Sequence, residues 1–263
     1  MSIQLRALVA AHLSDRRRSV LAWGLPVGLM SAFIVAIFPS VEDSISKVVN
    51  KYPSGLKEAF GIGQLSNVEQ YLHAEMLSLI VPLALGYLAV RAVASGLSGA
   101  AESGRLDVLL SAPVSRRRIC AAGFLATGVE LAAVLAVSWT LTMLGSVLSG
   151  AGLAAGPAAA GFASVWPLGL LFAGLGIVVC GWTLRTTIVT GAVAGVLVSM
   201  YVIDLIGRLD DDLSGVRYLS VFKYYGNAIE DGIEPLAFCG VAAAAAVLAA
   251  LGACLFDRCD LSG

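Results

Sequence analysis

The sequence predicts an all-α integral membrane protein with six transmembrane helices. Of its 263 residues, 58% are hydrophobic and only 13% carry a charge, whereas a soluble domain carries about 25% charged residues. The mean hydropathy is +0.87. The charge-poor runs are long enough to cross a bilayer, which takes about 20 residues of helix, and no long linker separates them. We therefore treat residues 1–263 as a single transmembrane domain.

Six apolar runs account for the predicted spans. They are residues 20–38, 76–97, 119–148, 162–182, 188–206 and 235–256. The boundaries between residues 145 and 165 stay open, because that stretch is rich in glycine and alanine and carries no charge. The polar segments 39–74 and 207–234 are predicted outer loops that contain short helices.

Residues 1–19 precede the first span and are predicted to form an amphipathic interfacial helix that lies on the membrane. Their apolar side chains fall on one helical face, and basic side chains, including Arg16, Arg17 and Arg18, fall toward water and lipid headgroups. A signal peptide is the alternative, since arginines precede an apolar core. We favour the interfacial helix because no clear small-x-small cleavage site follows that core.

The distribution of basic residues predicts the orientation. In multi-pass membrane proteins, the cytoplasmic side carries the excess of lysine and arginine. With six spans, eleven arginines fall on the side of the two termini, and six lysines or arginines fall on the other side. We therefore expect a plasma-membrane protein whose two termini are both cytoplasmic.

The stretch 100–119, AAESGRLDVLLSAPVSRRRI, is the longest polar interruption on the cytoplasmic side. Its leucines recur at helical spacing and give a short helix one apolar face. Pro113 ends that helix, and Ser115 can cap the next one. Two interpretations stay open from the residues alone: an ordinary basic loop that sets the topology, and a coupling helix that docks onto a partner.

The residues ESGRLDVLLSAPVSRRR resemble the cytoplasmic loop of ABC-2 type permeases, the membrane subunits of ATP-driven exporters. That loop lies between the second and third spans and reads Glu-x-Gly-x-Leu-x-x-Leu-Leu-Ser-x-Pro-Val-Ser-Arg. Two shorter segments, YPSGLKEAFGIG and YLSVFKYYGNAIEDGIEP, are similar to the first and last outer loops of the same family. The chain departs from the family just after the cytoplasmic loop, where Ala121, Ala122 and Gly123 stand in place of a common lysine.

The resemblance implies a cytoplasmic coupling helix that contacts an ATPase. Its contact residues would be Glu102, Arg105, Leu106, Asp107, Leu109 and Leu110. The resemblance also implies that two ATPase copies work with two permease chains, either as a homodimer or as a pair of similar chains.

The sequence carries no motif for binding and hydrolysing ATP itself. It contains no Gly-x-x-x-x-Gly-Lys-[Ser/Thr] P-loop, no nucleophile-elbow or zincin motif and no cysteine–histidine cluster at metal-ligand spacing. The net charge of −1 offers no basic field for nucleic acid. We therefore expect no enzyme activity, no cofactor or metal and no nucleic-acid partner for this chain, with ATP and Mg²⁺ bound by a separate ATPase subunit.

Three charged residues fall inside the predicted spans. Glu130 lies about 18 Å into the third span when counted from Arg118 at 1.5 Å per residue. An ionisable group in lipid is costly unless it is paired, and Arg91 on the antiparallel second span is the predicted partner. Whether this pair is structural or lines a substrate path stays open. We expect Asp204, near the outer end of the fifth span, to be solvated.

Two pairs of glycines, Gly24/Gly28 and Gly191/Gly195, have the four-residue spacing that lets membrane helices approach closely. Packing within the chain is the favoured interpretation of each pair. The resemblance adds a second interpretation, because the first and fifth spans of ABC-2 permeases meet across a dimer.

Together these features favour a permease subunit that exports hydrophobic or amphiphilic compounds, such as drugs, antibiotics or lipids. The path would follow a dimer interface formed by spans one, two and five, next to membrane lipid. One alternative is a secondary transporter, which would need midplane sites in two similar halves. The other is a non-transporting immunity or scaffold protein. A neighbouring gene for a P-loop ATPase would favour the exporter.

Overall fold

The computed structural model describes residues 3–51, 67–104, 115–209 and 211–258, and in the first of these ranges it describes side chains from Arg16 to Glu42. These parts of the chain are helical throughout, joined by turns and short connections. The elements are α1 (Ile3–Lys51), α3 (Val68–Leu72), the π-helix η2 (His73–Leu77), α4 (Ile80–Glu102), α6 (Arg116–Ser149), α7 (Ala155–Cys180), α8 (Thr186–Leu209), the 3₁₀-helix η3 (Asp211–Leu219), α9 (Val221–Tyr225) and α10 (Pro235–Arg258).

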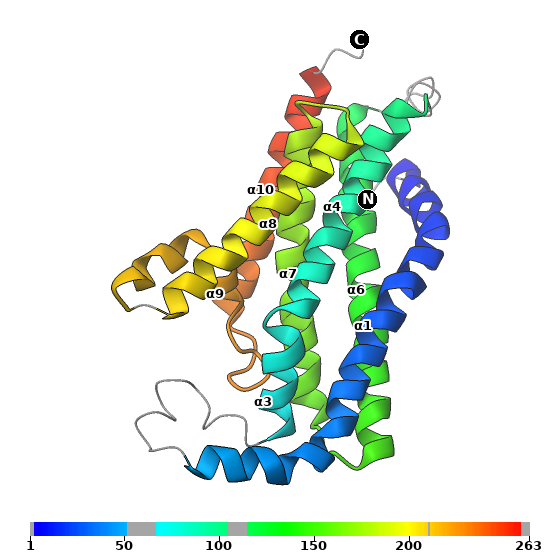
Figure 1. Ribbon diagram of the computed structural model, residues 1–263. Helices are drawn as coiled ribbons and strands as arrows, with labels where there is room; N and C mark the ends of the chain where they lie inside the picture. The colour runs from blue at the N-terminus through cyan, green and yellow to red at the C-terminus, as the bar shows by residue number, and fades with distance from the viewer. Residues whose placement is uncertain (1–2, 52–66, 105–114, 210, 259–263) are drawn as a thin grey trace.

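Six of the described helices are long and apolar enough to cross a membrane, which confirms the predicted all-α fold with six spans. The spanning segments belong to α1, to α3–η2–α4 taken together, and to α6, α7, α8 and α10. In Figure 1 they run alternately down and up, so α1 begins and α10 ends at the same end of the bundle. The end of α4 and the start of α6 lie at that end as well. We call this the loop end, and the opposite one the far end.

The first helix is longer than the sequence predicted. α1 is continuous from Ile3 to Lys51, where we had expected an interfacial helix over 1–19 and a separate span over 20–38. Its apolar run contains Pro26 and Pro39, and prolines bend helices without always ending them. The lower part of α1 turns across the far end of the bundle (Figure 1). The interfacial placement of residues 1–15 stays a prediction, because their side chains lie outside the described residues.

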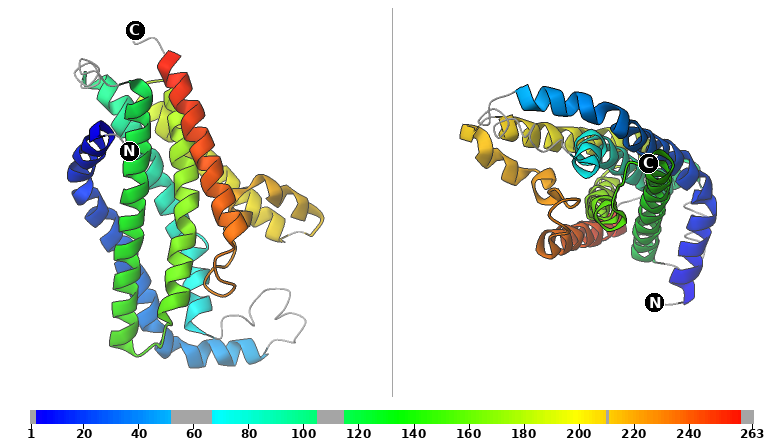
Figure 2. Two further views of the ribbon diagram at one scale, coloured as in Figure 1. Left: turned by 180° about the vertical axis from the view of Figure 1, so that it is seen from behind. Right: turned by 90° about the horizontal axis from the view of Figure 1, so that it is seen from below.

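The spans differ in how deeply they are buried. In the most apolar windows of α4, α6 and α7, 61–67% of residues are buried, against 17–28% in α1, α8 and α10. The view along the bundle in Figure 2 shows the same arrangement, with α1, α8 and α10 on the outside. α4 lies between α1 and α8 on one side (Figures 1 and 2). This side is the α1–α4–α8 face.

Two separate hydrophobic clusters hold the bundle. The larger joins α1, α4, α6, α7 and α10, and it includes Val189 near the start of α8. The smaller joins α8 and α9 to α4 and α7, and its buried members are Val90, Leu168, Phe172, Val193, Leu197, Val221 and Phe222. α8 is therefore attached to the bundle mainly through the smaller cluster, to which α9 also contributes.

Candidate functional site

A buried ion pair joins three helices at the centre of the bundle. Glu130 on α6 is only 2% exposed, and its Oε2 lies 2.7 Å from Nη1 of Arg16 on α1. The same Nη1 also donates to Oγ1 of Thr127 at 2.8 Å, and Nη2 donates to the carbonyl oxygen of Ala92 on α4 at 3.1 Å. One guanidinium thus ties α1, α4 and α6 together.

The predicted partner of Glu130 was wrong, because the structure pairs it with Arg16 and not with Arg91. Ala92 faces the ion pair through its carbonyl oxygen, whereas Arg91 is exposed. Arg91 shares the open side of α4 with Tyr87, which is also exposed and four residues away, so both lie along one helical stripe. The expectation that Arg16 points to water was wrong for the same reason.

The surroundings of the ion pair favour a structural role. The cavity beside Arg16 has a volume of about 10 Å³, which is room for no more than about one water molecule. It is lined by Ala92, Gly96, Gly123 and other mostly apolar residues. A substrate of the size of a drug needs a pocket of roughly 300 Å³ or more. Of the two interpretations left open by the sequence, the structure supports the one in which the pair holds helices together.

A second polar contact lies at the loop end and joins α4 to α8. Glu102 is the last residue of α4, and its Oε1 accepts a hydrogen bond from the backbone N–H of Thr186 at 2.9 Å. Its Oε2 accepts a hydrogen bond from Oγ1 of Thr186 at 2.9 Å. Thr186 is the first residue of α8, so a carboxylate from one helix caps the N-terminus of another. We call this contact the Glu102 cap. No spacing or motif in the sequence pairs these two residues, which lie far apart along the chain.

The remaining predicted coupling residues are Arg105, Leu106, Asp107, Leu109 and Leu110, and they lie outside the described residues. Their docking role therefore stays a prediction. The flanks of the stretch are described. Ser115 takes the N-cap position of α6 with extended backbone angles, although its side chain makes no capping hydrogen bond. Arg117 pairs with Asp257 of α10 at 3.0 Å, and both side chains are exposed.

The expected solvation of Asp204 was wrong. Asp204 is 2% exposed, with Oδ2 lying 2.6 Å from Nη2 of Arg208 and Oδ1 lying 3.0 Å from Nε of Arg217. Arg217 belongs to η3, which folds back along the end of α8 and shields the carboxylate. From the sequence alone, Asp204 is a single charged residue on a helix. The sequence does not show that the segment after α8 folds back onto it.

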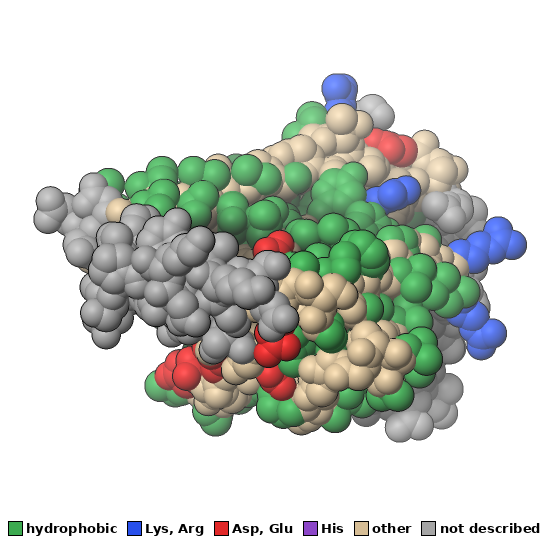
Figure 3. Space-filling model, turned by 60° about the horizontal axis from the view of Figure 1, so that its bottom comes forward, with side chains coloured by type: hydrophobic (Ala, Val, Ile, Leu, Met, Phe, Trp, Pro, Cys, Tyr) green, Lys and Arg blue, Asp and Glu red, His purple; other side chains and the backbone are tan. Residues whose placement is uncertain are grey.

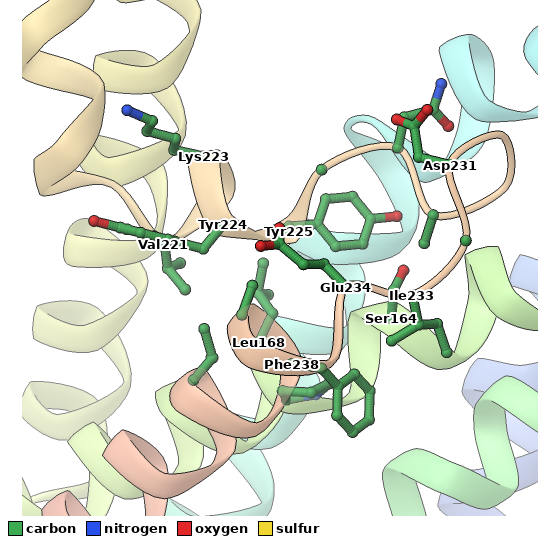
Figure 4. Close-up of a pocket in the computed structure, with 17 residues that line it drawn as sticks. Ser164, Leu168, Val221, Lys223, Tyr224, Tyr225, Asp231, Ile233, Glu234 and Phe238 are labelled. Atoms are coloured by element: carbon green, nitrogen blue, oxygen red, sulfur yellow. The ribbon is translucent and has the colours of Figure 1, made fainter.

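A pocket of about 110 Å³ opens near the far ends of α7 and α10. One wall comes from α9, with Lys223 and Tyr225, and the opposite wall comes from α7 and α10, with Ser164 and Phe238 (Figure 4). The Tyr225 and Ser164 hydroxyl groups face each other in this view. Burial raises the pKa of Tyr225, and the hydrogen bond to Ser164 lowers it by less. Tyr225 therefore stays neutral at physiological pH. We call this space the α9 pocket.

An apolar groove of about 300 Å³ runs between α6, α7 and α10. Its aromatic wall includes Trp139, Phe162, Trp166 and Phe238. Nε1 of Trp139 donates to the carbonyl oxygen of Ala155 at 3.3 Å, and Nε1 of Trp166 likewise bonds a backbone oxygen. Both indoles thus turn their polar group into the protein and leave the groove apolar, as suits a surface that faces hydrocarbon.

The two glycine pairs occupy opposite environments. A Cβ atom at Gly24 would lie 3.0 Å from Cγ1 of Val137 on α6, and one at Gly28 would lie 2.9 Å from Cα of Ser138. Gly24 and Gly28 therefore pack within the chain, as expected. A Cβ atom at either Gly191 or Gly195 would meet no atom within 4 Å, so this α8 pair has no described neighbour inside the chain.

Charged side chains are distributed unequally between the two ends. Figure 3 shows carboxylates gathered at the far end, where Glu75, Glu230, Asp231 and Glu234 are exposed. The loop end presents Arg117, as well as other arginines at the start of α6. Within the described ranges, no three histidine, cysteine, aspartate or glutamate side chains come together as metal ligands would.

Six helices that are long and apolar enough to cross a membrane are typical of a multi-pass membrane protein. The chain belongs to the family described as the multidrug efflux system permease Rv1217c, C-terminal domain, whose model matches residues 5–257. Membership of a multidrug efflux permease family supports a role as a membrane permease. No curated protein matches the chain.

Proposed function

We propose that the chain is the membrane subunit of an ATP-driven exporter, an ABC-2 type permease. It would move hydrophobic or amphiphilic compounds outward across the plasma membrane. The observation that carries the proposal is the match of residues 5–257 to a multidrug efflux permease. The near-continuous resemblance of the loop between the second and third spans to the ABC-2 coupling helix adds the ATP-driven part.

The energy would come from a separate subunit. The chain has no P-loop, so ATP and Mg²⁺ would be bound by a partner ATPase, present in two copies. The stretch from Arg105 to Leu110 would insert its leucines into a groove of that ATPase, with Arg105 and Asp107 setting the orientation by charge. A helix fixed at both ends to spans suits this task, because it can pass on movement without bending.

Two copies of the chain would form the transport path. The helices that form the α1–α4–α8 face expose large apolar side chains, including Phe33 on α1 and Val198 on α8. Gly191 and Gly195 lie on α8 without a neighbour in their own chain and would allow close approach of a second copy. An apolar path between two such faces suits drugs and lipids better than ions.

The charge distribution supports the orientation that we propose. The loop end carries the arginine cluster at the start of α6, and the far end carries the exposed carboxylates (Figure 3). Cytoplasmic ends of spans carry the excess of arginine and lysine. The loop end, with both chain termini, would therefore face the cytoplasm, where ATP is available.

Co-purification of the ATPase with variants of the loop tests the proposal. Leu109→Asp should remove the ATPase from the purified complex while leaving the amount of permease in the membrane unchanged. Arg117→Ala is the matched control, because its ion pair with Asp257 is exposed and such pairs contribute little, about 0–1 kcal/mol. If Leu109→Asp and the doubly acidic Leu106/Leu109 variant both retain the ATPase, the docking assignment is wrong.

A further inference from the structure

The Glu102 cap links the end of α4 to the first turn of α8. The first N–H groups of a helix have no partner within it, and negative charge is favoured there. Glu102 supplies both an acceptor and a negative charge to α8, although it belongs to α4. It is also the residue from which the chain leaves α4 for the loop. Any shift of the loop that moves Glu102 is therefore passed to the first turn of α8.

α8 is suited to respond as a unit. In its most apolar window only 22% of residues are buried, against 61% for α4. It packs on α4 and α7 mainly through the smaller hydrophobic cluster, and near its start Val189 also joins the main core. A helix with so little buried surface can move against the bundle at lower cost than α4 or α7, because few apolar contacts must be broken.

The far end of α8 is tied to η3 and α9. Oγ of Ser220, at the start of α9, donates to the carbonyl oxygen of Met200 at 2.7 Å. The rings of Tyr201 and Phe222 meet edge to face with centroids 5.6 Å apart. The ion pair of Asp204 with η3 adds a third tie. α8, η3 and α9 are thus joined by backbone, aromatic and ionic contacts.

This joined unit forms one wall of the α9 pocket. Val221 and Tyr225 of α9 face Leu168 on α7 and Phe238 on α10 across it (Figure 4). The opposite wall belongs to helices held in the main core. Movement of α8 with α9 would therefore change the width of the pocket, although Tyr225 packs on both clusters.

We propose that Glu102 is a positioning residue that transmits displacement of the cytoplasmic loop to α8, and through α8 and α9 to the α9 pocket at the far end. This inference rests on the proposed function, since it supplies the route by which closure of a bound ATPase opens the outer side. It also moves Glu102 from the predicted ATPase contacts to an internal role, because both of its carboxylate oxygens are engaged by Thr186.

The test compares export with ATP turnover. The tagged permease is produced from its native genomic setting, ethidium efflux is measured in cells, and ATP hydrolysis is measured in the complex that co-purifies. We expect Glu102→Ala to keep the ATPase and its ATP turnover, while ethidium efflux per ATP hydrolysed falls by about fivefold or more, the lower range of a coupling between two sites. Thr186→Val should lower this ratio less, because its backbone N–H remains, and Thr186→Ser should restore it.

Asp257→Asn is the matched control, since it removes one exposed carboxylate at the same end of the bundle and should leave the ratio unchanged. Wild-type efflux per ATP in both Glu102→Ala and Thr186→Val would overturn the inference. Loss of the ATPase from Glu102→Ala would also overturn it, because Glu102 would then belong to the docking surface. If no ATPase co-purifies even with the wild-type chain, the proposed function fails as well. Should Glu102→Ala reach the membrane poorly, Thr186→Val carries the test, because one hydrogen bond of the cap survives in it.

Discussion

α1 and α8 lie on the same face of the bundle and carry glycine pairs of identical spacing, yet they are attached in different ways. Gly24 and Gly28 bring α1 against α6 until a single added carbon would collide, and Arg16 fastens α1 to the same helix. A Cβ atom at Gly191 or Gly195 would meet no described atom within 4 Å, and the polar contacts that hold α8 lie at its ends. The four-residue spacing of glycines therefore permits close helix packing but does not determine which helix is the neighbour. It also suggests that α1 is a fixed element and α8 a mobile one.

The largest effect should follow from breaking the ion pair that fixes α1. Removing one partner leaves a buried charge unpaired, which costs about 3–5 kcal/mol, so Arg16→Gln and Glu130→Gln should each strongly lower thermal stability in detergent. The double variant should lose much less than the sum of the two. Arg91→Gln is the control, since Arg91 is exposed and its effect should add independently to that of Glu130→Gln. Additive losses for Arg16 and Glu130 would show that the pair does not hold α1.

A smaller loss is expected when the seam between α1 and α6 is crowded. Gly28→Leu places atoms against the backbone of Ser138, and overpacking of this kind costs about 1–3 kcal/mol. The melting temperature of the purified protein, followed by tryptophan fluorescence, should fall. A variant that melts like the wild type would mean that α1 and α6 are not in close contact.

A glycine-to-leucine substitution on α8 should leave the fold of the chain intact and weaken the dimer. A Cβ atom at Gly195 meets no described atom of its own chain within 4 Å, so the melting temperature of the isolated chain should stay unchanged. The bulky side chain should instead weaken the dimer that we propose across this face. The fraction of dimer can be measured by light scattering in detergent or by cross-linking in membranes. An unchanged dimer would remove Gly195 from the interface.

The smallest of these effects should come from the far end of α8. Asp204→Asn weakens two charge-assisted hydrogen bonds, but both arginine partners are partly exposed. We therefore expect a loss of roughly 1–2 kcal/mol, seen chiefly as faster hydrogen exchange in residues 213–222. Faster exchange spread evenly over all spans would contradict the picture of α8, η3 and α9 as a joined unit.

The membrane spans could be predicted from the sequence because each depends only on the composition of its own residues. Long charge-poor runs predict membrane helices without knowledge of neighbours, and all six were found. The internal polar contacts were missed because they depend on which side of a helix faces which neighbour. The pairing rule that selected Arg91 used only the order of the spans, whereas one step along α4 turns that side chain away from Glu130. Asp204 was misjudged because its partner Arg217 lies beyond the end of the helix.

The limits of α1 were missed for a different physical reason. The sequence analysis ended an interfacial helix at residue 19 and the first span at residue 38. In the structure the helix continues past both, because Arg16 pairs with Glu130 of α6 and a proline can bend a helix without ending it. The coupling stretch from Arg105 to Leu110 rests on resemblance to a family, and only experiments on the loop can test it.

The most direct test of the central claim is transport in proteoliposomes. The permease is reconstituted with and without the ATPase that co-purifies with it, and ethidium movement is followed with either ATP or a proton gradient as the energy source. Ethidium movement should require both ATP and the ATPase, and it should persist when a protonophore collapses the gradient. Transport by the permease alone, driven by the gradient and indifferent to ATP, would contradict the account and identify a secondary transporter.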